Sequence, residues 1–217
     1  QHGMLLETYL LLGDHGDHRE RARLRKQIVR VGWHPHVESH FEAMAYTAMQ
    51  ELATQVFYLR AAHVCQDEDP MLARALRRVA RDEVLHMAFY RDAVKAHLEV
   101  EPNYVEPLVK VMLEFAMPGA MMPDYATRAS ILARQGVYGP DHFFSLVVDK
   151  LWKEWDIPGL MPTAEKARDA QRKLAVHHEK LGRIAARMAV RRNPSVKEQE
   201  ATGIARAQQE AMLKLGE

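Results

Sequence analysis

Two central segments of this chain, residues 37–66 and 70–99, are each about 30 residues long and contain no Gly, and no Pro beyond Pro70. Such segments exceed the usual length of a globular helix and suit the long helices of a bundle. Apolar residues of the second segment recur at steps of three and four: Leu76, Val79, Ala80, Met87 and Tyr90. This spacing is typical of a buried helical face. The sequence therefore predicts an all-α fold.

Turn-forming residues divide the rest of the chain into further helical segments. Clusters of Gly, Pro and Asp fall at 13–16, 32–35, 67–70, 117–119, 138–140 and 157–159. The predicted helices span 1–12, 17–31, 37–66, 70–99, 104–117, 124–135, 140–155, 163–189 and 195–215. No segment alternates apolar and polar residues between hairpin turns, so no sheet is expected.

The composition, 47% apolar and 27% charged with a net charge of +1, is that of an ordinary globular protein. We expect one domain over residues 1–190 and a helical tail over 191–217. No apolar run is long enough to predict a membrane span. The single cysteine, Cys65, excludes an intramolecular disulfide framework and suits a reducing cytoplasm. Any metal site must therefore use His, Glu and Asp.

A carboxylate and an imidazole interrupt the apolar face of the second long segment. Glu83 and His86 are three residues apart, so they project from one side of a helix, one turn from each other. A buried carboxylate is costly unless a charge or a metal compensates it. A Glu-x-x-His pair directed into a helix bundle is also half of a carboxylate-bridged di-iron or di-manganese centre. A surface or ion-paired Glu beside a core histidine fits this short motif too.

The first long segment carries a second carboxylate on a small, polar face. Glu51 shares that face with Thr47, Ala48, Thr54, Gln55 and Tyr58, whereas an apolar ridge runs beside it: Met49, Leu52, Val56 and Leu59. A bundle helix needs small residues where something other than a side chain must fit. An isolated Glu could equally be solvated, but the combination with Glu83 and His86 favours a metal site.

The beginning of the sequence shows neither an initiator Met nor a helix cap. Residues 1–12 read as a helix from the first position, which suggests that the chain as given starts inside a helix. His2 could then close another Glu-x-x-His motif whose Glu lies upstream. A terminal histidine without a functional role is the other interpretation.

A basic run occupies the predicted second helix: Arg19, Arg21, Arg23, Arg25, Lys26 and Arg30, diluted by Glu20. A solvated helix face is the simplest interpretation. The nearly balanced overall charge and the lack of a recognition motif argue against nucleic acid as a partner. An acidic protein partner is the better functional alternative, because local positive charge steers encounter.

With these residues in view, the chain resembles the soluble acyl-acyl carrier protein desaturases, especially their actinobacterial branch. The resemblance is carried by residues 2–10 (HGMLLETYL), 46–54 (YTAMQELAT) and 82–90 (DEVLHMAFY). It covers most of residues 1–155 and fades after about residue 168. It implies a larger helical bundle with a ferritin-like four-helix core, a homodimer, and two iron ions held by four carboxylates and two histidines.

Position by position, the resemblance implies a role for each site residue. Glu51 looks like a terminal carboxylate on the iron that His86 also ligates, and Glu83 looks like a bridging carboxylate. His2 looks like the histidine of the other iron. Thr54 matches a catalytic threonine near the oxygen-binding side, and Asp82 matches an acidic position that supports the ligands. The remaining two carboxylates precede the first histidine in the family, so the chain as given is expected to be N-terminally truncated.

The implied reaction is oxygen-dependent desaturation of an acyl chain carried on acyl carrier protein, in fatty acid biosynthesis. The implied partners are the carrier protein, docking on a basic rim, and a ferredoxin-like electron donor. Three alternatives use the same fold: a related di-iron oxygenase or hydroxylase, a ferritin-like iron store, and a metal-free scaffold that binds acyl carriers without activity.

Overall fold

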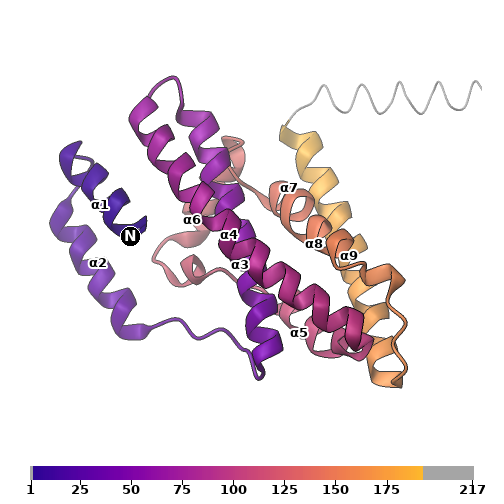
Figure 1. Ribbon diagram of the computed structural model, residues 1–217. Helices are drawn as coiled ribbons and strands as arrows, with labels where there is room; N and C mark the ends of the chain where they lie inside the picture. Colours follow the sequence, from indigo (N-terminus) through magenta and orange to yellow (C-terminus); the bar gives the residue numbers. More distant parts are fainter. Residues whose placement is uncertain (1, 193–217) are drawn as a thin grey trace, which may run out of the picture.

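The computed structural model describes residues 2–192, and these residues form an all-α fold (Figure 1). Its α-helices are α1 (His2–Leu12), α2 (His18–Val31), α3 (His40–Cys65), α4 (Pro70–Val100), α5 (Val105–Glu114), α6 (Tyr125–Arg134), α7 (Pro140–Phe143), α8 (Asp149–Glu154) and α9 (Glu165–Arg192). No strand occurs among these residues, so the predicted all-α class is confirmed, and the arrangement is consistent with a ferritin-like bundle. The predicted helix at 195–215 lies outside the described residues.

None of the helices between residues 2 and 192 combines the length and apolar character that a membrane crossing requires. The predicted lack of a membrane span therefore holds for this part of the chain.

Capping interactions fix the start of each long helix. Helix α3 begins at His40 rather than at residue 37, because Ser39 Oγ accepts the backbone N–H of Glu42 at 3.1 Å. Glu42 Oε2 in turn accepts the backbone N–H of Glu38 at 2.8 Å, which satisfies another free donor at the helix end. Helix α4 begins at Pro70, where the missing N–H costs nothing, and Asp69 Oδ1 accepts the N–H of Leu72 at 2.8 Å.

Two further predicted helices differ from the structure. Helix α5 ends at Glu114 instead of 117, since Phe115 already leaves helical geometry with ψ 124°. Met117, which Pro118 restricts to extended backbone, has ψ 146°. The predicted helix 140–155 is divided by a π-helical turn, η3 (Phe144–Val148), between α7 and α8. A π turn inserts one extra residue into a helix and leaves no Gly or Pro signal in the sequence.

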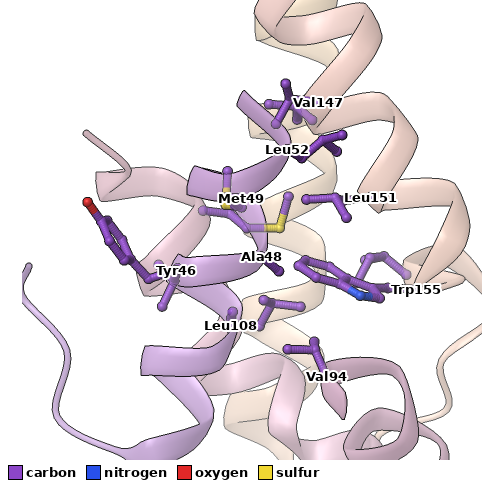
Figure 2. Packing of buried hydrophobic residues seen from close by; sticks show 14 of the residues in the cluster. Tyr46, Ala48, Met49, Leu52, Val94, Leu108, Val147, Leu151 and Trp155 are labelled. Carbon is purple, nitrogen blue, oxygen red and sulfur yellow. The ribbon is translucent and has the colours of Figure 1, made fainter. Parts of the chain in front are cut away.

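The main core lies between the α3–α4 pair and the helices that follow it. Met49 and Leu52 of α3 face Leu151 and Trp155 from the α8 region, as Figure 2 shows. The four side chains are almost completely buried, and the indole N–H of Trp155 donates to the carbonyl of Arg91 at 3.0 Å. Each such side chain contributes roughly 1.5–3 kcal/mol by burial. This core holds α3 and α4 in fixed register.

Helices α1 and α2 lie on one side of the α3–α4 pair, whereas α7, α8 and α9 lie on the other (Figure 1). Neither α1 nor α2 contains a fully buried residue. Leu6 packs on a small cluster at the α3–α4 turn, centred on Leu76. The Tyr9 hydroxyl donates to Asp69 near the same turn. Helix α1 is thus held against the hairpin by few contacts.

Substituting Asp69→Ala should lower the denaturation midpoint by a few degrees, since it removes the cap of α4 and the acceptor for Tyr9. The backbone N–H of Leu72, followed by the Tyr9 hydroxyl, lowers the pKa of Asp69. The stabilisation should therefore be present above the unfolded-state pKa and disappear as the pH falls through the folded-state pKa. Thermal unfolding of the exposed-site control Asp67→Ala should change little; equal midpoints for both variants would contradict the capping role.

Candidate metal centre

The two long helices bring Glu51 and Glu83 to the same level of the bundle. The connection between α3 and α4 is only residues 66–69, so the helices pack antiparallel along their length. Glu51 lies about as far before this turn as Glu83 lies after it. Glu51 of α3 and Glu83 of α4 therefore lie opposite each other across the interface between the two helices.

Glu51, Glu83 and His86 form a compact cluster. One ligand atom from each lies within 4.8 Å of the other two. His86 Nδ1 is 3.1 Å from Glu83 Oε2 and 3.9 Å from Glu51 Oε2. The structure thus brings together the three residues whose spacing predicted a shared site, while their roles as metal ligands remain a proposal.

Helix α1 adds a second imidazole to this cluster. His2 Nδ1 is 3.0 Å from Glu83 Oε1, and His2 Nε2 is 3.1 Å from Asp82 Oδ2. Glu83 therefore lies between two imidazoles, with one carboxylate oxygen directed at each. Asp82 contacts the nitrogen of His2 that faces away from Glu83. Hydrogen bonds of this kind orient ligand imidazoles in metal sites.

The two carboxylates are largely removed from solvent. The Glu83 side chain is 7% exposed and that of Glu51 is 16% exposed. Burial, together with the neighbouring Glu83, raises the pKa of Glu51 to about 7, and His86 offsets part of this effect. Burial and the charge of Glu83 also raise the pKa of the Tyr58 phenol.

The residues present fit a metal ion. Two buried carboxylates this close repel each other when both are ionised, and a cation held between them relieves that repulsion. Carboxylate oxygens and imidazole nitrogens are suitable ligands for iron. The raised pKa of Glu51 reflects its burial first and its proximity to Glu83 second.

The expectation that the whole cluster lies in the bundle interior is wrong for His86. Its side chain is 56% exposed, because it lies at the edge of the α3–α4 interface. There it lines an open cleft of about 700 Å³, together with His2, Gly3, Arg78, Asp82 and Leu85. Arg78 had no role in the sequence-based site; its only signal was its position one turn before Asp82.

The polar face of α3 extends beyond Glu51. Thr54 is half-buried one turn after Glu51, in agreement with its predicted place on that face. On the neighbouring ridge Met49, Leu52 and Val56 are buried, but Leu59 is 46% exposed, contrary to the predicted pattern. On α3 the main core thus ends at Val56, and the buried part of the small cluster at the α3–α4 turn begins beyond Leu59.

The arginines of α2 are mostly engaged within the chain. Arg23 forms a two-point hydrogen bond with Glu20, at 2.6 and 2.8 Å. Arg25 pairs with Glu7 of α1, and Arg21 bonds to His18 and to the carbonyl of His15. These contacts leave less free positive charge for an acidic partner than the sequence suggested.

Several known proteins are similar to this chain. The family model described as fatty acid desaturase matches residues 1–205. DesA1 of Mycobacterium tuberculosis, whose name describes an acyl-acyl-carrier-protein desaturase, is 31% identical over 166 residues, covering 72% of this chain and 48% of DesA1. The chloroplastic acyl-acyl-carrier-protein desaturase 3 of Oryza sativa subsp. indica is 31% identical over 170 residues, covering 74% of this chain and 42% of the relative.

A third relative is the chloroplastic stearoyl-acyl-carrier-protein 9-desaturase of Gossypium hirsutum, which is 28% identical over 182 residues. That match covers 78% of this chain and 46% of the relative. The chain thus spans slightly less than half the length of these relatives.

Proposed function

This chain belongs to the fatty acid desaturase family. We therefore propose that it is part of an enzyme that desaturates an acyl chain on acyl carrier protein. The enzyme would use two iron ions and dioxygen. The observation that carries the proposal is the position of Glu83. Its two carboxylate oxygens lie 3.0 Å from His2 and 3.1 Å from His86. A carboxylate placed between two imidazoles is arranged to bridge two metal ions.

In this proposal His2, Glu51, Glu83 and His86 hold the iron ions, with Glu83 shared between them. When bound, the two ions would activate dioxygen, which, with two electrons from the donor and two protons, removes two hydrogen atoms from an unactivated CH2–CH2 unit and leaves as two water molecules. Further ligands would come from parts of the full-length protein beyond this chain. A related hydroxylase would use the same ligands, so the product has to decide between the two reactions.

The chain's own residues prepare the site in several ways. Asp82 accepts a hydrogen bond from His2 and so fixes the orientation of that ring. Thr54 is half-buried one turn from Glu51, and its hydroxyl would hold or pass a proton beside the cluster. The polar face around Thr47, Thr54 and Tyr58 is the proposed place for the acyl chain, where exclusion of water would favour the oxidation.

The partners follow from the same premise. Acyl carrier protein would deliver the substrate, a ferredoxin-like donor would supply electrons, and two copies would form a homodimer in the cytoplasm. We expect carrier docking to involve the α2 arginines Arg19, Arg21, Arg23 and Arg25. Arg21, Arg23 and Arg25 have intramolecular partners, so only Arg19 supports a role in docking.

The test combines iron content with product mass. The full-length protein, purified with iron, should contain two iron ions per chain and convert stearoyl-acyl carrier protein, in the presence of reduced ferredoxin and dioxygen, to a product lighter by two hydrogen atoms. A product heavier by one oxygen atom would replace the proposal with hydroxylation. Absence of both iron and product, in a folded protein, would favour the metal-free scaffold.

A further inference from the structure

A second concave site lies away from the carboxylate–histidine cluster, between α6, the start of α7 and the end of α9. It is an open groove of about 560 Å³. Among the described residues its lining comprises Ala129, Ser130, Ala133, Arg134, Pro140, Met188 and Arg191. None of these belongs to α1, α3 or α4, so the groove shares no residue with the proposed iron site.

Small residues allow the groove walls to approach. A Cβ atom placed on Gly139 would lie 3.1 Å from the Cβ of Ala133, so glycine permits the chain to pass tightly against α6 before α7 begins. Ala129 and Ala133 are one turn apart on the same face of α6. Arg60 of α3 holds this region in place by donating to the carbonyl of Gly136 at 2.7 Å. The result is an apolar floor, completed by Met188.

Both charged side chains in this lining are arginines. Arg134 donates to the Oγ of Ser130 at 2.9 Å. Arg191 extends from the last turn of α9. Over residues 2–192 no carboxylate lines the groove, and neither guanidinium takes part in an ion pair of this part of the chain. This contrasts with Arg23 and Arg25 of α2, which are paired with glutamates.

We propose that this groove binds a single-chain fatty carboxylate. The head group would lie between Arg134 and Arg191, since a guanidinium binds a carboxylate through two parallel hydrogen bonds. The hydrocarbon chain would lie along Ala129, Ala133 and Met188. The groove volume falls within the range of small-molecule sites, which are mostly apolar with a few placed polar groups. The lining residues between positions 2 and 192 include no aromatic side chain, so this part of the groove offers no stacking surface for a nucleotide base.

Direct binding of sodium dodecanoate to the full-length protein, measured by isothermal titration calorimetry below the micellar concentration, tests this assignment. Binding to the double variant Arg134→Gln/Arg191→Gln should weaken at least about 30-fold, because each charge-assisted contact contributes roughly tenfold or somewhat less. The matched control Lys26→Gln/Arg30→Gln removes two exposed α2 charges and should change dodecanoate affinity less than about twofold. Octanoate should bind wild type at least about tenfold more weakly than dodecanoate, owing to its shorter apolar chain.

Met188→Gln keeps the side-chain length and suits a helix, so it tests the apolar floor without breaking α9. This substitution should reduce the difference in binding affinity between dodecanoate and octanoate. It should leave the melting temperature unchanged. Equal dodecanoate affinity in the groove variant and the α2 control would overturn the proposal, as would equal affinity for the two chain lengths. Loss of carrier-protein association in the groove variant, without dodecanoate binding to wild type, would instead identify a protein-docking surface. Iron content and desaturation are measured in parallel. If both are normal while dodecanoate binding fails, the groove proposal is wrong and the proposed function stands.

Discussion

Glu83→Gln should remove at least half of the bound iron from the full-length protein and reduce desaturation by about 100-fold or more, because even residues that only support ligands typically contribute 10–100-fold. The amide keeps the size of the side chain and one oxygen, but it cannot supply negative charge to both sides of the site. Glu83 is the one residue that contacts both His2 and His86 in the cluster described for residues 2–192. Iron stoichiometry by mass spectrometry and turnover with acyl carrier protein substrate would measure both effects.

Without metal, the same substitution should not lower the unfolding temperature of the protein. Burial and, after it, the neighbouring Glu83 raise the pKa of Glu51 to about 7, and part of the Glu83 effect is repulsion between two ionised carboxylates. Replacing Glu83 by Gln removes that repulsion, so the metal-free variant should unfold at a temperature no lower than metal-free wild type. Glu99→Gln, at an exposed position of the same helix, is the matched control and should retain iron and activity. Normal iron content and turnover in Glu83→Gln would exclude the bridging role.

Trp155→Ala should cost about 3–5 kcal/mol of the free energy of unfolding, the usual range for emptying a buried aromatic site. Trp155 is 1% exposed, and the substitution also removes its hydrogen bond to the carbonyl of Arg91. At roughly 2–4 °C per kcal/mol for a chain of this size, the melting temperature should fall by about 10 °C. Thermal unfolding followed by circular dichroism measures the change.

Trp152 provides a comparison three residues earlier, within α8, the helix that ends just before Trp155. It is half-buried and stacks on the ring of His178, with 4.4 Å between ring centroids. Trp152→Ala should therefore cost clearly less than Trp155→Ala. Similar losses for the two variants would show that the core around Met49, Leu52 and Leu151 does not depend on the Trp155 indole.

The central part of the site could be predicted because it depends on regular geometry. Helical periodicity placed Glu83 and His86 on one face, and the short turn between two long helices brought Glu51 to them. These relations are local or follow from a single antiparallel pairing. The place of His2 came from the resemblance alone, since nothing near residue 2 indicates which distant helix it contacts. Its position beside Asp82 and Glu83 requires the three-dimensional structure.

Other features could not be predicted because they depend on which surfaces meet. The π turn at 144–148 contacts both α3 and α9 and carries no characteristic residue. The exposure of His86 depends on what covers α4, and the pairing of Arg25 depends on α1 lying beside α2. The groove formed by Arg134 and Arg191 joins residues far apart in sequence, and each alone reads as an ordinary surface charge.

The sparse attachment of α1 has a consequence for dynamics. Since α1 contributes no fully buried residue, its detachment exposes little apolar surface and should require much less free energy than global unfolding. Such local opening would withdraw the His2 imidazole from Glu83 while the α3–α4 hairpin stays folded. Amide hydrogen exchange in α1 should therefore be faster than in the centres of α3 and α4. His2, on one side of Glu83, thus belongs to a helix that is expected to open by itself. His86, on the other side, belongs to the more stable α3–α4 hairpin.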